Sequence, residues 1–232
     1  MAIDLTSNEI FNWLCEEGSG TALGDASGNS RGGTLTNGPT WTTGKWGNAV
    51  SQDGTNDCIV LPHSSVFNGL TAVSGSVWCK LSSWSSATLN SLLCKQDNAT
   101  GYPSFDMRGD LGGSSTAHEI SLTVGTTGYT ASGPLRLQVG YWYHLGFSWN
   151  GVTGALRAWA NGVPGATTTT ATGTMANSTS DLWVGGNPSF GSRHTAGVFK
   201  GIRFWARELN ADEWQALCLW PLRGGVSVVR GA

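Results

Sequence analysis

Charged residues are scarce in this chain. Only 12% of the 232 residues are Asp, Glu, Lys or Arg, and the formal net charge is −2, whereas ordinary soluble domains carry about 25% charged residues. A basic patch for nucleic acid or for an anionic membrane surface is therefore not expected. A surface with so few charges favours fixed contact with neighbouring molecules. The alternative is that Ser, Thr and Asn side chains keep the surface solvated in place of charged ones.

The sequence also lacks segments that direct a chain into or across a membrane. No apolar run approaches the ~18 residues of a membrane span, and residues 1–14 show no basic stretch followed by an apolar one, so we expect no signal peptide. The cysteines are odd in number, lie in apolar runs and lack zinc-ligand spacing: Cys15, Cys58, Cys79, Cys94 and Cys218. We expect free thiols and folding in a reducing cytoplasm.

Patterns of the common catalytic sites are missing as well. Glycosidases need two carboxylates about 5 to 9 Å apart across the scissile bond, and alternate positions of one strand would supply them. Glu16 and Glu17 are adjacent and point to opposite faces, while Asp106 and Glu119 are isolated, as expected of solvated edge charges. His144 lies near no nucleophile motif and is expected to be a hydrogen-bonded structural residue. We therefore expect no catalytic residues and no enzymatic activity.

Glycines and short apolar runs dominate what is present. The 34 glycines and the Ser/Thr-rich connections suit about a dozen short strands joined by turns. The clearest pattern is a hairpin in which residues 141–149 and 155–160 flank a turn with Asn150, Gly151 and Gly154. Both faces of its first strand carry bulky side chains, so we expect a central strand that is covered on both sides.

Two segments depart from the strand pattern. Residues 39–50 carry Trp41 and Trp46 among glycines, which favours an irregular cover over the strands. Near the other end, Asn210 is expected to be an N-cap with Glu213 as its capping-box partner, so one short helix is predicted over residues 210–217. With no internal repeat and no linker, the chain fits one domain of two packed antiparallel sheets.

Several short motifs follow one another in a recognisable order between residues 11 and 217. They include Asp25-Ala-Ser-Gly28-Asn29, Gly44-Lys-Trp-Gly47-Asn-Ala49, Trp142-Tyr-His144, Asn161-Gly162 and Leu209-Asn-Ala-Asp-Glu213. Their order resembles the laminin-G-like, concanavalin A-like lectin family. The resemblance implies an all-β, two-sheet antiparallel jelly-roll sandwich with one short C-terminal helical turn, over residues 1–220. It does not fix the function, because this fold hosts lectins, glycosidase modules, adhesion domains and viral structural proteins.

Oxygen-bearing side chains in two loops suggest a metal site. Members of the family often bind calcium, and the best set of oxygen ligands is Asp25, Asn29, Asp53 and Asp57. The alternative is that these residues only form turns, because Asp and Asn before Gly or Ser bond their own backbone. We expect any bound cofactor to be structural Ca²⁺ near Asp25.

Aromatic side chains suggest a sugar-binding surface. Most of the twelve tryptophans fall in expected strands and are assigned to the core. The tryptophans in expected loops are candidate platforms for the apolar face of a sugar ring: Trp41, Trp46 and Trp84.

Taken together, these features favour a virion protein. The chain resembles the laminin-G-like proteins that bacteriophages encode, so we expect a non-enzymatic capsid decoration or attachment protein. Its expected partners are other virion proteins or copies of itself, with cell-surface glycans and without nucleic acid or membrane insertion. A free carbohydrate-binding module or an adhesion domain of a bacterial protein is the alternative, although secreted modules usually carry a signal peptide. A glycoside hydrolase is the third and least favoured possibility.

The last twelve residues, 221–232, form a tail beyond the family pattern. A β-prone Val226-Ser-Val-Val229 follows Gly225 and lies between Arg223 and Arg230. Such a segment needs partners for its N–H and C=O groups, and an exposed sheet edge supplies them. The tail is therefore expected to form an assembly contact with a neighbouring subunit, or else an extra strand beside the first strand of its own chain.

Overall fold

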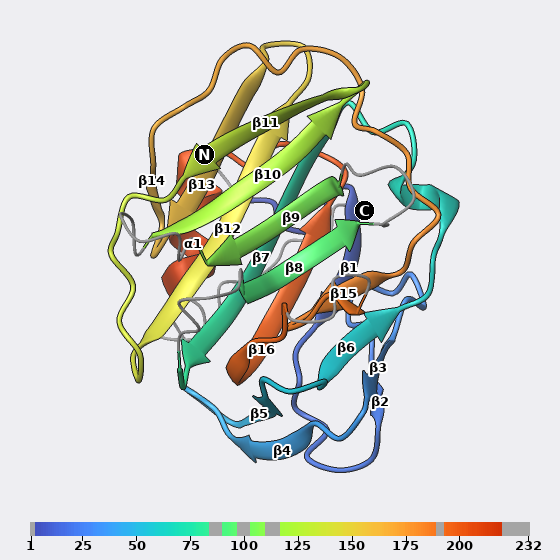
Figure 1. Ribbon diagram of the computed structural model, residues 1–232, viewed down its shortest axis with the longest axis vertical. Helices are drawn as coiled ribbons and strands as arrows, with labels where there is room; N and C mark the ends of the chain where they lie inside the picture. The colour runs from blue at the N-terminus through green and yellow to red at the C-terminus, as the bar shows by residue number, and fades with distance from the viewer. Residues whose placement is uncertain (1–2, 84–89, 97–102, 110–116, 189–192, 220–232) are drawn as a thin grey trace.

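The protein is an antiparallel β-sandwich. The computed structural model describes residues 3–83, 90–96, 103–109, 117–188 and 193–219. Two sheets, each of eight strands, pack against one another, and β8 to β11 of one sheet cross in front of β7 and β12 of the other in Figure 1. The predicted all-β jelly-roll sandwich is confirmed. Trp84 and residues 221–232, to which the sequence assigned roles, lie outside the described residues.

Sheet A runs in the order β14-β13-β12-β7-β16-β5-β4, and β1 also pairs with β16. Because β12 bonds both to β13 and to β7, the predicted hairpin is confirmed and its first strand is interior. The strands of sheet A are β1 (Glu9–Trp13), β4 (Thr40–Thr43), β5 (Asn48–Asp53), β7 (Ala72–Leu81), β12 (Trp142–Asn150), β13 (Ala155–Ala160), β14 (Val163–Pro164) and β16 (Ala196–Trp205).

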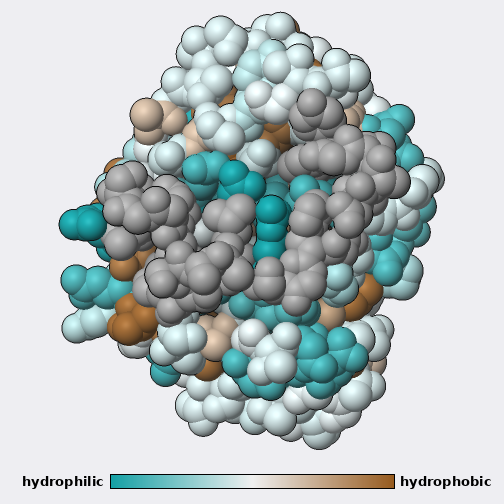
Figure 2. Space-filling model, in the orientation of Figure 1, coloured by the Kyte–Doolittle hydropathy of each residue, from teal (hydrophilic) through white to brown (hydrophobic). Residues whose placement is uncertain are grey.

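Sheet B runs in the order β11-β10-β9-β8-β15-β6-β3-β2. Seen from this side, the coloured surface is mostly white and teal with small separate brown patches, as expected of a chain rich in Ser and Thr (Figure 2). The strands of sheet B are β2 (Ala22–Leu23), β3 (Gly33–Thr36), β6 (Cys58–Leu61), β8 (Asn90–Gln96), β9 (Pro103–Gly109), β10 (His118–Val124), β11 (Thr127–Ser132) and β15 (Leu182–Val184).

The main core lies between the sheets and is rich in phenylalanine. The ring of Phe204 lies 5.1 Å from that of Phe105 on sheet B and 5.5 Å from that of Phe67 in the single turn of 3₁₀-helix Ser65–Phe67. Leu145 and Phe147 of β12 are fully buried in this core. The alternation predicted for β12 is therefore confirmed on its inner face.

The outer face of sheet A is partly covered by the helix α1 (Ala211–Leu219). Its capping box forms as predicted: Asn210 N donates to Glu213 Oε2 over 2.8 Å, and Glu213 N donates to Asn210 Oδ1 over 3.0 Å. Trp214 of this helix stacks on Trp159 of β13, with ring centroids 5.2 Å apart. Among the described helices, none is long and apolar enough to cross a membrane.

Two expectations about local structure are wrong. Residues 39–50 are not an irregular cover, because β4 and β5 form a regular ladder at one edge of sheet A. The glycines lie in the turn between them, where Gly44 N donates to Gly47 O over 2.8 Å and Gly47 adopts a φ of +53°. The glycines therefore belong to a hairpin turn instead of interrupting the strands, and Trp41 lies on β4 and not in a loop.

The second error concerns Asp106 and Glu119, which are not solvated edge charges. Asp106 is completely buried on the interior strand β9, where it accepts a hydrogen bond from Ser91 Oγ over 3.1 Å and lies 3.2 Å from Arg193 Nη1. Glu119 pairs with Arg108 over 2.8 Å. Both carboxylates are held by arginines, as a charge inside a sheet requires.

The five cysteines are free, as predicted. Four of them are buried and Cys218 is half-buried. Burial raises the pKa of the Cys79 thiol to about 12 and that of the Cys58 thiol to about 11. These thiols act as small apolar core residues.

A candidate ligand pocket on the outer face of sheet A

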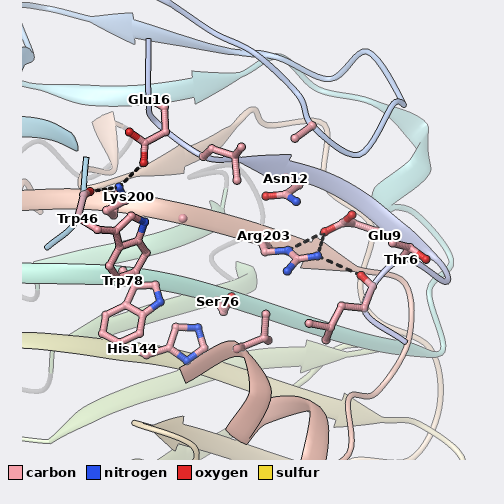
Figure 3. Close-up of a pocket in the computed structure, with 15 residues that line it drawn as sticks. Thr6, Glu9, Asn12, Glu16, Trp46, Ser76, Trp78, His144, Lys200 and Arg203 are labelled. Atoms are coloured by element: carbon pink, nitrogen blue, oxygen red, sulfur yellow. Dashed lines mark hydrogen bonds and ion pairs between the residues drawn. The ribbon is translucent and has the colours of Figure 1, made fainter. Parts of the chain in front are cut away.

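A cavity of about 400 Å³ lies on the outer face of sheet A beside α1 (Figure 3). Pockets that hold small ligands usually measure roughly 300 to 1,000 Å³. Strands β7, β12, β16 and β1 form its floor, and its walls include Leu5, Leu14, Glu16, Trp46 and Leu217. We call this cavity the sheet A pocket.

One row of the floor runs across three strands. His144 of β12 lies opposite Trp78 of β7, and Trp78 lies opposite Lys200 of β16. Cross-strand neighbours of this kind lie on one face of the sheet, so their side chains meet. The rings of His144 and Trp78 are accordingly 5.1 Å apart.

A second row runs parallel to the first. Gly146, Ser76, Arg203 and Asn12 follow one another on β12, β7, β16 and β1. Gly146 is required here because a Cβ at this position would lie 2.4 Å from the Trp214 ring. The missing side chain lets α1 approach the sheet and close one side of the pocket.

A β-bulge in β16 brings the two cations of the floor onto one face. Lys200 and Arg203 are three residues apart, which in a regular strand places them on opposite faces. The register of β16 shifts between them, and Gly201 adopts a φ of +56°. The extra residue turns both side chains toward the pocket.

Lys200 holds the aromatic wall of the pocket in place. Its side chain is 1% exposed, and its Nζ donates to Glu16 Oε1 over 2.6 Å, to Asn48 O over 2.9 Å and to the carbonyl of Trp46. The same Nζ lies 4.6 Å from the centroid of the Trp46 ring, and the Trp46 ring meets Trp78 edge-on at 5.2 Å. Trp46 is therefore fixed at the rim of the pocket.

Arg203 forms the other ion pair of the floor, on the side opposite the tryptophans in Figure 3. Its Nη2 lies 2.6 Å from Glu9 Oε1 and donates to Leu5 O over 3.1 Å. Burial raises the pKa of Glu9, and the positive charge of Arg203 opposes this shift. Together with Lys200 and Glu16, the pair gives the pocket two positive and two negative side chains, each with a partner.

Three polar atoms of the floor have no hydrogen-bond partner in the described part of the chain: Ser76 Oγ, His144 Nδ1 and Asn12 Oδ1. Ser76 is 0% exposed and His144 is 2% exposed. Burial, with a further effect of Arg203, lowers the pKa of His144 to about 3, so its imidazole is neutral at physiological pH. Buried polar groups normally find partners, so a ligand or water in the pocket would complete the bonding of these three atoms.

His144 is a buried residue with a hydrogen-bonded backbone, as predicted, and it also lines the pocket. Its backbone N–H donates to Asn161 Oδ1 over 2.9 Å, but its ring lies between the rings of Trp78 and Trp214 and Nδ1 has no partner among the described residues. The expected hydrogen bond is therefore made by the backbone of His144 and not by Nδ1 of its ring. The sequence shows only a histidine in a strand and gives no sign that a pocket lies above it.

Of the expected sugar platforms, Trp46 lines the sheet A pocket and Trp41 does not. Trp41 is half-buried on β4, where its Nε1 donates to Gly20 O over 2.8 Å. Trp78 is buried, as its place in a strand predicted, but it also lines the pocket, which the sequence did not indicate. Trp78 does lie in a strand, but on the outer face, and only the sheet order reveals that α1 leaves it beside a cavity.

The expected calcium ligands do not form one site. The Asp25 carboxylate accepts a hydrogen bond from Asn12 N on β1, and β1 pairs with the C-terminal end of β16. Asp53 instead lies opposite Ala196, at the N-terminal start of β16. Of the residues described, no three His, Cys, Asp or Glu side chains gather as a metal-binding group. The two pairs of ligands are therefore separate.

Each pair organises its own loop. The Asp25 carboxylate accepts backbone N–H groups of Asn12, Ser27 and Arg31 over 2.9 to 3.0 Å, and Asn29 Nδ2 donates to Glu9 O over 2.7 Å. Asp53 Oδ1 accepts from Thr55 N over 2.7 Å, and Asp57 Oδ2 accepts from Asp53 N over 3.0 Å. These contacts fit turn formation, and calcium binding near Asp25 stays a prediction.

Solved structures resemble the chain over most of its length. The binding domain of Paraclostridial Mosquitocidal Protein 1 matches with a TM-score of 0.73 and 14% identity, over 93% of this chain and 52% of that one. Domain 4 of AbnA, a GH43 extracellular arabinanase from Geobacillus stearothermophilus solved with arabinotriose, matches with a TM-score of 0.68 and 18% identity, over 91% and 98%. The botulinum neurotoxin serotype D ligand binding domain, in complex with N-acetylneuraminic acid, gives 0.69 and 12%, over 92% and 51%.

These identities show a shared fold. The chain spans about half the length of the toxin domains that it matches. No curated protein sequence matches it. A family model described as the concanavalin A-like lectin/glucanases superfamily matches residues 53–214, which is more than half of the sequence. The chain therefore belongs to the concanavalin A-like lectin/glucanase superfamily.

Proposed function

We propose that this chain is a non-catalytic glycan-binding domain and that the sheet A pocket is its binding site. The observation that carries the proposal is the pairing of an aromatic wall, in which the half-buried Trp46 packs on the buried Trp78, with unpartnered polar atoms in the floor of one cavity. The apolar C–H face of a sugar ring can pack on the tryptophans, and its hydroxyls can bond to the unpartnered polar atoms. Structural neighbours that are toxin binding domains and a domain solved with arabinotriose support this choice.

The carboxylates of the pocket support a non-catalytic role. Glu9 is 2.6 Å from Arg203, and Glu16 is 2.6 Å from Lys200. Glycosidases place two carboxylates across the scissile bond, whereas both carboxylates of this pocket are engaged by the cations of the floor. The two glutamates therefore serve to hold the cations of the floor.

The binding site is tested by replacing Trp46. Screening the full chain against immobilised glycans identifies a ligand, and titration calorimetry then compares the wild-type protein with Trp46→Ala. Loss of one stacked aromatic side chain is expected to weaken binding about tenfold. The matched control is Trp142→Ala, because Trp142 is half-buried on the same sheet face but does not line the pocket.

Unchanged affinity in Trp46→Ala would remove the sheet A pocket as the binding site. Failure of the wild-type chain to bind any glycan would remove the proposed function itself.

We further propose that this binding domain acts on a virion, as a capsid decoration or attachment protein that contacts other virion proteins or copies of itself. The weakly charged composition supports fixed contacts with neighbours. Co-purification with assembled particles tests the proposal, and a protein found only free of particles contradicts it. The alternative is a carbohydrate-binding module or adhesion domain of a bacterial protein, favoured by the match that covers 98% of the arabinanase domain.

A further inference from the structure

We infer that the sheet A pocket selects an uncharged sugar, a neutral mono- or disaccharide unit, over acidic ones. The inference rests on the proposed glycan binding and names its ligand class. It depends on three features of the floor: the pairing of its charges, the location of its unpartnered polar atoms, and the difference between Ser76 and its neighbour Ser74.

The charged side chains that line the pocket are paired with one another, which disfavours an acidic ligand. Lys200 and Arg203 each lie 2.6 Å from a carboxylate, so the four charged side chains that line the pocket sum to zero. A further cation, Lys45, lies with its Nζ 5.1 Å from the centroid of the Trp78 ring but does not line the pocket.

An acidic sugar would have to displace Glu9, whose side chain is only 4% exposed, or Glu16, which also accepts a hydrogen bond from Asn48 N over 2.8 Å. Displacing Glu9 leaves a buried carboxylate without its cation, which is costly, and displacing the more exposed Glu16 leaves the buried Lys200 without its carboxylate.

The unpartnered atoms match hydroxyl groups. Asn12 Oδ1 only accepts hydrogen bonds, Ser76 Oγ donates and accepts, and neutral His144 donates or accepts at Nδ1 according to its tautomer. A sugar hydroxyl also donates and accepts, so it satisfies each of these groups without bringing a charge. A purely apolar ligand would fill the cavity but leave all three without partners, which carries a penalty for each.

The rim completes this match. Leu14 is 41% exposed and Trp46 is half-buried, so an apolar surface borders the opening of the pocket. The ring face of a neutral pyranose or furanose can lie on this surface while its hydroxyls reach the polar floor.

Ser76 and Ser74 provide a matched pair of tests within one strand. Both serines are 0% exposed and lie on the outer face of β7, two residues apart. Ser74 Oγ accepts a hydrogen bond from Leu209 N over 2.9 Å, whereas Ser76 Oγ lacks a partner among the described residues and lines the pocket. A structural hydroxyl and a ligand-binding hydroxyl therefore respond in opposite ways to removal.

The test measures affinity and stability of the full chain together. Calorimetry is run with neutral probes (methyl glucoside, methyl galactoside, N-acetylglucosamine, arabinose and their disaccharides) and with acidic ones (glucuronate and N-acetylneuraminic acid), at low and high salt. We expect a neutral probe to bind at least tenfold more tightly than any acidic one, with little dependence on salt. Ser76→Ala should weaken that binding about three- to tenfold with no fall in melting temperature. Ser74→Ala should lower the melting temperature and leave the affinity unchanged.

The outcomes separate the two proposals. Tighter, salt-sensitive binding of an acidic probe overturns the selectivity and leaves glycan binding intact. Neutral binding that Ser76→Ala does not alter overturns the role of the floor. If no probe binds and Ser76→Ala lowers the melting temperature as much as Ser74→Ala, Ser76 is structural and both proposals fail.

Discussion

At the scale of single residues, burial decides which groups of this protein carry charge. The cationic side chains of Lys200 and Arg203 can be buried in the pocket because each lies beside a carboxylate. His144 and His118 are buried without a carboxylate, and burial lowers their pKa values to about 3 and about 4. Because both pKa values are lowered in the folded protein, the two histidines make the free energy of unfolding depend on pH.

Acid should destabilise the protein through these histidines. A folded pKa below the unfolded value of about 6.5 means that the unfolded chain binds protons first as the pH falls, so stability is present above pH 6.5 and lost toward pH 3. At pH 5 the loss is roughly 2 kcal/mol for each histidine. Between pH 7 and pH 5, the free energy of unfolding of His144→Gln should fall about half as much as that of the wild-type protein. Urea unfolding at both pH values measures this difference. Equal losses in the two proteins would show that His144 is not buried in its neutral form.

At the scale of elements, one irregularity in β16 determines the site. Gly201 is the residue of the bulge that turns Lys200 and Arg203 to the same face. Its φ of +56° disfavours other residues, and a Cβ there would lie 3.2 Å from Trp78 Cδ1. The bulge therefore connects backbone geometry directly to the floor of the pocket.

Replacing this glycine should affect both stability and binding. Gly201→Ala is expected to cost about 1 to 2 kcal/mol for the backbone conformation, with an added cost from the contact with Trp78, and to weaken ligand binding. The control is Gly125→Ala, because Gly125 has a φ of +58° and a Cβ at that position would have no neighbour within 4 Å. Urea unfolding and calorimetry on both variants measure the effects. Equal changes in both would mean that the bulge has no special role.

At the scale of the whole molecule, sheet A ends at the edge strands β14 and β4 and sheet B at β11 and β2, and an edge strand is a place where a further strand can pair. The tail after Trp220 is expected to make such a contact, since its β-prone segment favours an unpaired sheet edge. Removing residues 221–232 should abolish binding to particles without changing the melting temperature, as measured by sedimentation with particles and by thermal unfolding. A fall of several degrees with particle binding retained would instead assign the segment to the chain's own sandwich.

Calcium binding would also affect the stability of the whole domain. If Ca²⁺ binds near Asp25, a chelator lowers the melting temperature of the whole domain, because a ligand of the folded state stabilises it. An unchanged melting temperature together with no ion detected in the purified protein removes the expected site.

The sequence by itself determined the elements of this protein, because these depend on local patterns. Alternating apolar residues predicted the β12–β13 hairpin, Asn210 with Glu213 predicted the capped helix, and the apolar surroundings of the cysteines predicted free thiols. It failed at residues 39–50, since glycines in a turn and glycines that interrupt a strand have the same local pattern.

Only the tertiary structure decided the site. His144, Trp78 and Lys200 are far apart in sequence, and the order of β12, β7 and β16 makes them neighbours. The bulge at Gly201 then adds Arg203 to the same face, and α1 encloses the cavity above it. A strand pattern tells which residues alternate, but register, strand order and the element that covers each face arise from contacts between distant segments, so the sequence did not locate this pocket.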